Sequence, residues 1–326
     1  MGWESSLDVD DFWTKGYVVL PGVYSPEEIA EIRDAVYASE GQGGDLLANP
    51  RLRHLLTDGR MTEVAKRLLG TDDILYAGDS SFTINGTQRG WHKDNTDRLD
   101  PKAPDWDDRY TQLRFGIYCQ DHVHHTGGLN LKIGSHDIPN LTDGETLYVK
   151  TQPGDLAVWS MRITHSGNGM LLKDPEAAYP DPSEQKDIDP ELVTPADGDR
   201  IAVFAHLGAD DKHGRRYADY LKTRTYMVNA WRLRPYDDES RAAAKAAGLS
   251  LRDMPAEVMD DPRAGLDAQW QPYPYPGWTP PASKAAAKKA PPKKKAAPAP
   301  PPPPQGLKAR GKAAVRGALA GWRGGR

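Results

Sequence analysis

The middle of the chain is a series of short apolar segments separated by turns, and this pattern limits the fold more than any other feature. The segments are too short for helices and have the length of strands. Glycine, asparagine, aspartate and proline between them favour tight reversals of the backbone. The turn pairs are Asn85-Gly86, Gly127-Gly128, Asp143-Gly144, Pro153-Gly154 and Asp197-Gly198. The expected strands are Ile74–Tyr76, Ser81–Ile84, Leu113–Cys119, Leu129–Ile133, Thr146–Val149, Asp155–Ser160 and Arg200–Ala205.

Two helices are expected before these strands. A short strand at Tyr17–Leu20 leads to Ser25, which can cap a helix whose third residue, Glu28, completes a capping box. Apolar residues at helical spacing follow at Ile29, Ile32 and Val36. A second helix is expected over Met61–Leu69, and the region from about Tyr217 to Trp270 has a largely helical pattern. Helices followed by many short strands indicate an α+β domain with a β-sandwich or barrel core.

The last part of the chain has a different composition. Residues 281–326 hold twelve Lys and Arg and no acidic residue, which leaves 30 basic against 46 acidic residues, a net charge of −16, in residues 1–280. A segment rich in Pro, Ala and Lys cannot bury enough apolar surface to offset its ordering entropy. We therefore expect one domain over residues 1–279 and a disordered basic tail over residues 280–326. The tail is expected either to touch an anionic surface weakly or to act only as a solubilising appendage.

Composition also excludes several classes of protein. No run approaches 18 consecutive apolar residues, so no transmembrane helix is expected. The acidic domain is not expected to bind nucleic acid, and the first residues lack the features of a secretory signal. The single cysteine, Cys119, can form neither an internal disulfide nor a thiolate zinc site. We therefore expect a cytoplasmic protein.

A histidine and an aspartate stand two residues apart, just after one of the expected strands. In an extended chain such residues point to the same side, so His92 and Asp94 can both face one metal ion. The best third ligand is His165, which lies just beyond another apolar strand, where an antiparallel core could bring it beside His92. Two histidines and one carboxylate on one face are the ligand set of non-haem Fe(II) oxygenases.

Other readings of these histidines stay open. His-x-Asp is common by chance, and a lone histidine is more often a surface or core residue than a ligand. The run Asp121-His122-Val123-His124-His125 also invites a metal site, although a loop tip of this composition usually just meets solvent. His136, in a Gly-Ser-His turn, is expected to be a structural hydrogen-bonding residue.

Several motifs occur in a fixed order around these residues. They are Gly16-Tyr17-Val18-Val19-Leu20-Pro21-Gly22, Trp91-His92-Lys93-Asp94, Thr126-Gly127-Gly128-Leu129, Ile133-Gly134-Ser135-His136 and Gly154-Asp155 followed by Arg162-x-x-His165-Ser166-Gly167. With them, residues 9–207 resemble the phytanoyl-CoA dioxygenase family of Fe(II)/2-oxoglutarate oxygenases. The resemblance implies a double-stranded β-helix (jelly-roll, cupin-like) core flanked by helices. It also implies Fe(II) held by His92, Asp94 and His165, with 2-oxoglutarate and O2 as co-substrates.

The family binds the distal carboxylate of 2-oxoglutarate with an arginine about ten residues after the distal histidine, and this chain departs from that spacing. The first arginine after His165 is Arg200. We expect the polar, proline-rich residues 173–199 to be an insertion or lid, and Arg200 to supply the bidentate clamp at the start of the next strand. Arg162 precedes the ligand and is expected to brace it.

The resemblance thus implies a dioxygenase that hydroxylates a small molecule while 2-oxoglutarate is decarboxylated to succinate. The carboxylate of Asp94 fills the position that related halogenases leave open for chloride, which favours hydroxylation. A natural-product or sugar-type substrate is favoured over an acyl-CoA. Two alternatives remain: a non-catalytic jelly roll that binds a ligand or partner, and a cupin-like metalloenzyme that does not use 2-oxoglutarate.

The separation of domain and tail has a direct test. Deletion of residues 281–326 is expected to leave turnover of a soluble substrate intact, because a segment without a packed core contributes nothing to the site. The measurement is turnover by residues 1–280 compared with the full chain. Loss of turnover in the shortened chain would mean that the tail is not a separate appendage.

Overall fold

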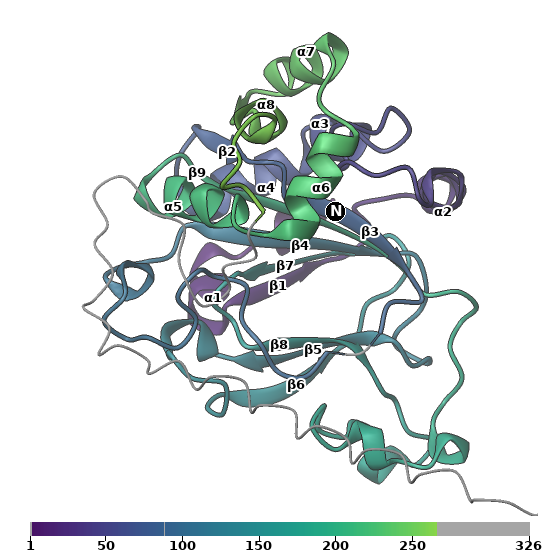
Figure 1. Cartoon of the computed structure of the whole chain (residues 1–326). Helices are drawn as coiled ribbons and strands as arrows, with labels where there is room; N and C mark the ends of the chain where they lie inside the picture. Colours follow the sequence, from purple (N-terminus) through teal and green to yellow (C-terminus); the bar gives the residue numbers. More distant parts are fainter. Residues whose placement is uncertain (1, 88, 266–326) are drawn as a thin grey trace, which may run out of the picture. The chain divides into compact units, whose positions relative to one another are not determined.

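The computed structural model describes residues 2–87 and 89–265. The expected tail over residues 280–326, and its boundary with the preceding domain, lie outside the described residues. The described part contains a larger, mainly antiparallel sheet and a smaller antiparallel sheet that face each other, with helices around the larger one (Figure 1). No helix among the described residues is long and apolar enough to cross a membrane.

The larger sheet has seven strands and is antiparallel except for its last pair. Its strands, in spatial order, are β1 (Tyr17–Leu20), β7 (Leu156–Ser160), β4 (Gln112–Tyr118), β9 (Ile201–Ala209), β2 (Ile74–Tyr76) and β10 (Leu249–Leu251), and β3 (Ser80–Ile84) pairs with β9. The smaller sheet has the order β6 (Glu145–Val149), β5 (Gly128–Ile133) and β8 (His165–Gly169).

The pairing of these strands is that of a jelly roll. In chain order the core consists of β3, a short bridge at His92, β4, β5, β6, β7, β8 and β9. The first of these segments pairs with the last, the second with the seventh, the third with the sixth and the fourth with the fifth. This nesting places the strands alternately in two facing sheets. The expected α+β class with a jelly-roll core is confirmed.

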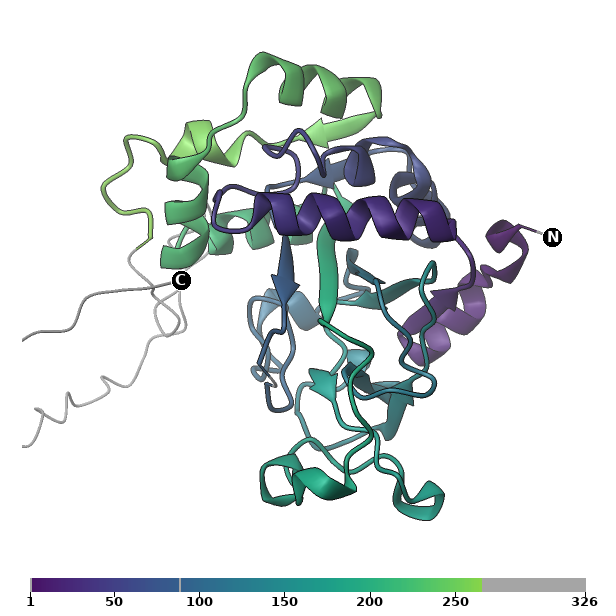
Figure 2. The same ribbon diagram turned by 90° about the vertical axis from the view of Figure 1, so that its right-hand side faces the viewer.

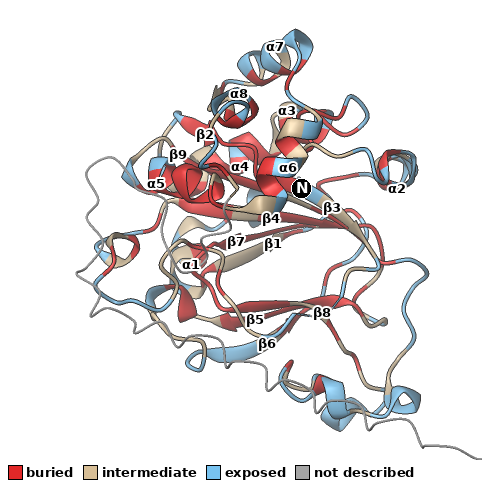
Figure 3. Cartoon of the chain, in the orientation of Figure 1, coloured by how far each residue is buried: buried red, intermediate tan, exposed pale blue. Residues whose placement is uncertain are grey.

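Side chains alternate between the two faces of the larger sheet, as the pleat requires. On β4, Leu113, Phe115 and Ile117 join the core beneath the helices, whereas Tyr118 joins the core between the sheets. The polar Gln112 and Arg114 share the inner face with Tyr118. The central strands of both sheets are largely buried, whereas the outer strand β6 is exposed at Glu145 and Thr146 (Figure 3). The space between the two sheets is therefore lined mainly by apolar side chains, with polar side chains such as Gln112 and Arg114 at single positions.

The helices of residues 9–69 cover the outer face of the larger sheet, whereas those of residues 212–233 and 254–258 pack with Leu75 on its inner face. Helix α2 (Pro26–Ser39), the long dark purple helix, runs across the outer side in the view turned by 90° (Figure 2). It begins with the expected capping box, in which Ser25 accepts from the Glu28 amide and the Glu28 side chain accepts from the Ser25 amide. The helices are α1 (Val9–Lys15), α2 (Pro26–Ser39), α3 (His54–Thr57), α4 (Arg60–Leu69), α5 (Lys212–Leu221), α6 (Thr225–Leu233), α7 (Asp238–Ala246) and α8 (Met254–Val258). Short 3-10 helices occur at Trp3–Ser6, Pro104–Trp106, Ser135–Asp137, Pro175–Ala177, Gln185–Asp187 and Pro190–Leu192.

Most expected elements are confirmed, and two strands were missed. The expected helix over Met61–Leu69 is α4, and all the expected strands form, most within a residue of their predicted ends. Strand β8 reads His-Ser-Gly-Asn-Gly, which lacks the β-branched and aromatic residues typical of strands. Strand β10 interrupts the expected helical region and pairs with β2 in parallel. Both strands exist because of distant partners, and local sequence does not encode those partners.

The C-terminal helices are joined to the domain by a buried polar contact. The Tyr236 hydroxyl donates to the carboxylate of Asp45, and both side chains are nearly inaccessible to solvent. Burial raises the pKa of Asp45 to about 6. Because the ordinary value is 3.8, the folded protein binds this proton more tightly than the unfolded chain does.

The raised pKa of Asp45 predicts a specific pH dependence of stability. The stabilisation from protonated Asp45 is present below about pH 4 and is lost as the pH rises through about 6, a loss of roughly 3 kcal/mol for about two pKa units. In Asp45→Asn the side chain stays neutral, so this contribution disappears. Urea unfolding of both proteins between pH 4 and 7.5 measures it. The expected result is a wild-type minus variant difference that falls with pH, and a constant difference would contradict it.

Candidate metal centre

His92 and His165 are neighbours because their backbones form an isolated antiparallel bridge. The His92 amide donates to the His165 carbonyl at 3.0 Å, and the His165 amide donates to the His92 carbonyl at 2.9 Å. Two residues further on, the Asp94 amide donates to the Met161 carbonyl at 2.9 Å. Segments more than 60 residues apart in the chain therefore hold the three side chains side by side.

The side chains of these residues converge on one point. One ligand atom from each of His92, Asp94 and His165 lies within 4.8 Å of the other two. The Nε2 atom of His92 lies 3.9 Å from one Asp94 carboxylate oxygen, and the Nε2 atom of His165 lies 3.6 Å from the other. Within residues 2–87 and 89–265 this is the group of His, Cys, Asp and Glu side chains able to hold a metal ion.

The hydrogen bonds of the two imidazoles leave their inner nitrogens available. The Nδ1 atom of His92 lies 2.8 Å from the Gly90 carbonyl, and the Nδ1 atom of His165 lies 3.2 Å from the Ile163 carbonyl. A carbonyl only accepts, so each Nδ1 carries the proton and each Nε2 carries a lone pair. This is the tautomer that a metal ligand needs, and backbone carbonyls commonly fix it in this way. The donor set therefore fits a divalent cation.

The charges around the cluster favour the protonation states of metal ligands. Burial, together with the nearby His92, lowers the pKa of His165 to about 3, so its imidazole is neutral at physiological pH. Burial by itself would raise the pKa of Asp94, but the imidazole of His165 and the guanidinium of Arg114 outweigh it and hold the pKa well below the ordinary value. A neutral imidazole and an ionised carboxylate are the forms that bind metal.

Lys93, between the two proposed ligands, points the opposite way and ties the segments together. Its side chain is fully buried, and its ammonium donates to the Ser135 and Arg162 carbonyls at 2.7 Å each. No motif in the sequence indicates this role of Lys93, although the alternation that sends His92 and Asp94 to one side of an extended segment sends Lys93 to the other. Lys93 therefore fixes the segment that carries His92 and Asp94 to the turn that precedes His165.

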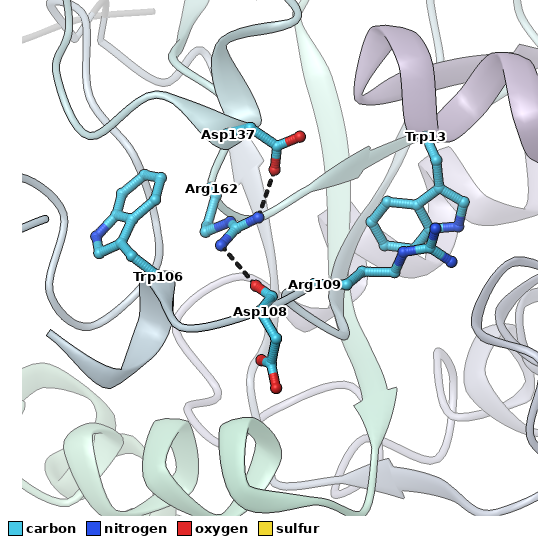
Figure 4. Close-up of a pocket in the computed structure, with 6 residues that line it drawn as sticks. All are labelled: Trp13, Trp106, Asp108, Arg109, Asp137 and Arg162. Carbon is cyan, nitrogen blue, oxygen red and sulfur yellow. Dashed lines mark hydrogen bonds and ion pairs between the residues drawn. The ribbon is translucent and has the colours of Figure 1, made fainter. Parts of the chain in front are cut away.

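Arg162 braces the same turn, as expected. Its guanidinium donates to the Asp105 carbonyl at 2.8 Å. It also donates to the Asp108 carbonyl at 3.0 Å and to the Asp137 carboxylate at 2.6 Å, and it lies 4.9 Å from the centre of the Trp106 ring (Figure 4). A cavity of about 360 Å³ opens beside it, lined by Trp13, Trp106, Asp108, Arg109, Asp137 and Arg162. None of the three clustered side chains lines this cavity. Arg162 therefore stabilises the turn that precedes His165 and does not itself face the three clustered side chains.

Arg200 immediately precedes β9 and lies between the sheets near β8. Its side chain is buried, its Nε donates to the Gly127 carbonyl at 2.5 Å, and its guanidinium lies 5.6 Å from the centre of the Tyr118 ring. A Cβ at Gly167 would lie 4.0 Å from its Nη2 atom. Gly167 follows His165 by two residues, about 7 Å along a strand. Within the described part of the chain, no carboxylate pairs with Arg200.

The histidine-rich run does not form a second cluster within the described residues. His122 is fully buried, and its ring nitrogens meet the Gln120 amide at 3.1 Å and the Thr151 hydroxyl at 3.0 Å. His124 is exposed and contacts the Asp121 carboxylate at 2.7 Å. The expectation that this run is only a solvent-facing loop tip is therefore wrong for His122. His136 is structural, as expected, with Nε2 3.0 Å from the Trp13 carbonyl.

Comparison with solved structures gives distant likenesses. No protein family model and no curated protein sequence matches the chain. The structure of EctD from S. alaskensis with 2-oxoglutarate and 5-hydroxyectoine has 18% identity and a TM-score of 0.45, over 62% of this chain and 74% of EctD. HygX from Streptomyces hygroscopicus, with nickel and 2-oxoglutarate bound, has 16% identity and a TM-score of 0.47, over 63% and 87%. SnoN, a non-haem α-ketoglutarate-dependent epimerase from nogalamycin biosynthesis, has 17% identity and a TM-score of 0.46, over 64% and 80%.

The geometry of the cluster predicts metal binding that depends on Asp94. Asp94→Asn is expected to weaken binding of Co(II), a spectroscopic substitute for Fe(II), by more than about 100-fold. Loss of a residue that only hydrogen-bonds to a ligand costs about 10- to 100-fold in metal affinity, and loss of a charged ligand is expected to cost more. The measurement is an anaerobic titration followed by visible absorption. Asp45→Asn is the matched control, since it makes the same change at a buried carboxylate outside the cluster. Equal affinity of wild type and Asp94→Asn would remove Asp94 from the metal centre.

Proposed function

We propose that this protein is a non-haem Fe(II)/2-oxoglutarate-dependent dioxygenase that hydroxylates a small molecule. The observation that carries the proposal is the convergence of His92, Asp94 and His165, with both Nε2 atoms free to bind. Two histidines and one carboxylate suit Fe(II) and leave coordination positions open. When bound, iron and 2-oxoglutarate supply the oxidising chemistry, in which O2 is consumed and 2-oxoglutarate is decarboxylated to succinate.

The protein's own role is to hold and shield these groups. His92, Asp94 and His165 would bind the metal ion, and Lys93 and Arg162 keep their segments in place through buried hydrogen bonds. No described side chain is required as a nucleophile, since the metal and the co-substrate carry the difficult chemistry. The ionised Asp94 occupies the third ligand position, which supports hydroxylation over halogenation.

Arg200 is the proposed clamp for the distal carboxylate of 2-oxoglutarate. A buried cation with no anion beside it is unfavourable, and a carboxylate would satisfy it with two parallel hydrogen bonds. Burial lowers the pKa of Arg200, which is the mark of this desolvation. The hydroxyl of Tyr118, whose ring lies under the guanidinium, is buried and has no hydrogen-bond partner within the described residues.

A second unsatisfied polar atom in the same interior supports a polar ligand. Within the described residues, the Trp159 Nε1 atom is buried without a hydrogen-bond partner, and the Trp159 ring lies 5.8 Å from the ring of His165. Buried polar groups are normally satisfied, so this donor and the Tyr118 hydroxyl together indicate a site for a polar molecule. We propose a natural-product or sugar-type substrate, the class that the motif resemblance favours over acyl-CoA.

The formation of the metal–co-substrate complex tests the proposal. Anaerobic addition of Fe(II) and 2-oxoglutarate to the full chain is expected to produce the weak visible charge-transfer band of the chelate. Binding of the metal without this band would support a cupin-like metalloenzyme that does not use 2-oxoglutarate. Failure to bind the metal would support a non-catalytic binding protein. A screen of small molecules for stimulated succinate release then identifies the substrate.

The role of Arg200 has its own prediction. Arg200→Ala is expected to raise the 2-oxoglutarate concentration for half-maximal band formation by about 10- to 100-fold, since a charged bidentate contact contributes about 1.5–3 kcal/mol. Arg33→Ala is the control, because Arg33 likewise donates to a backbone carbonyl, that of Cys119, and contacts none of the clustered residues. An unchanged requirement in Arg200→Ala would remove Arg200 from the site.

A further inference from the structure

A chain of charged and polar side chains runs from Asp94 to helix α5. The Nε of Arg114 lies 3.4 Å from the Asp94 carboxylate, and its Nη2 lies 2.9 Å from the Asp79 carboxylate. The Tyr217 hydroxyl donates to the same Asp79 oxygen at 2.6 Å. One guanidinium therefore stands between two carboxylates, and the one farther from the cluster also accepts from a tyrosine.

Every member of this chain is fixed by neighbouring structure. Arg114 lies on β4, Asp79 lies directly before β3, and Tyr217 lies on α5. The side chains of Arg114 and Asp79 are each 11% exposed, and Tyr217 is 3% exposed. The Asp79 carbonyl also accepts from the His206 amide at 2.9 Å, which holds the backbone of Asp79 against β9.

Arg114 lies closer to Asp79 than to Asp94, and this difference affects how Asp94 can act as a metal ligand. The 2.9 Å contact with Asp79 is a charge-assisted hydrogen bond, whereas the 3.4 Å approach to Asp94 lies beyond that range. A guanidinium with Asp94 as its sole counter-ion would compete with a metal ion for that carboxylate. Because Asp79 balances the charge of Arg114, the guanidinium can orient Asp94 and still leave the negative charge of Asp94 available to a metal ion.

We propose that Asp79, held by Tyr217, is a positioning residue of the metal centre: it neutralises Arg114, so that Arg114 orients Asp94 without withdrawing it from the metal. This inference rests on the proposed function, since it assigns residues that act on the same metal site through Asp94. It adds an acidic residue and a tyrosine that no motif in the sequence indicates. Outer partners of this kind commonly change metal affinity by 10- to 100-fold.

Tyr217 gives the C-terminal helices a part in the site. Helix α5 follows the region of residues 9–207 that carries the motif resemblance. The Tyr217 ring packs on His206 with 4.6 Å between ring centres, and the Nε2 of His206 lies 2.9 Å from the Gln112 side-chain oxygen. Because its ring is packed in this way, Tyr217 on α5 donates its hydroxyl to Asp79 from one fixed direction.

The test is metal affinity in the full chain, measured by anaerobic Co(II) titration with visible absorption as the second readout. Asp79→Asn is expected to weaken Co(II) binding by about 10- to 100-fold and to change the Co(II) spectrum. Tyr217→Phe, which keeps the ring and removes only the hydroxyl, is expected to weaken binding a few-fold. Tyr236→Phe is the matched control, because it removes a buried hydroxyl that donates to Asp45 outside the cluster, and its affinity is expected to equal that of wild type.

A double variant separates charge balance from damage to the fold. Asp79→Asn with Arg114→Gln removes the uncompensated cation, so it is expected to bind Co(II) at least tenfold more tightly than Asp79→Asn alone. Equal affinity of wild type and Asp79→Asn, or a double variant no better than Asp79→Asn, would overturn the inference. If Asp79→Asn does not fold, wild-type affinity and spectrum in Tyr217→Phe would overturn it. Absence of metal binding by wild type would instead overturn the proposed function.

Discussion

The pair of backbone hydrogen bonds between His92 and His165 is the contact on which the rest of the site depends. It is the second core segment of the jelly roll reduced to a single bridge. The bridge uses only backbone groups, so the side chains of His92 and His165 remain free to face inward. The nesting of the strands brings residue 92 opposite residue 165, and the two-residue spacing then places Asp94 beside both imidazoles.

The interior around this bridge contains many charges, and most of them are paired in a way that limits the cost of burial. Lys93 meets two carbonyls, Arg162 meets carbonyls and Asp137, and Arg114 lies between two carboxylates. Arg200 is the exception within the described residues, since it meets a single carbonyl and an aromatic ring. Arg200 therefore differs from the other buried cations in its surroundings, which supports its proposed role as a ligand-binding residue.

Two additions to the jelly roll contact the site region. The segment of residues 173–199, between β8 and β9, reaches the residue that precedes His92, where the Trp91 indole donates to the Asp181 carboxylate at 3.1 Å. The C-terminal helices reach the inner side of the larger sheet, where Tyr217 donates to Asp79. Neither addition belongs to the nested strands, yet each meets a residue next to the proposed ligands or one contact away from them. Both segments therefore belong to the surroundings of the proposed metal centre.

The sequence by itself determined the local elements and the ligand spacing: the Ser25 capping box, the strands between turn pairs, and His92-x-Asp94 with His165 as its partner. These follow from rules that act over a few residues, such as helix capping and alternation along an extended chain. Only the tertiary structure decided that the Gly-rich β8 is a strand, that Lys93 bridges two segments, and that Asp79, Arg114 and Tyr217 meet. Such contacts depend on which distant segments pair. The free-energy difference that favours one pairing over another comes from contacts throughout the core, which short stretches of sequence do not encode.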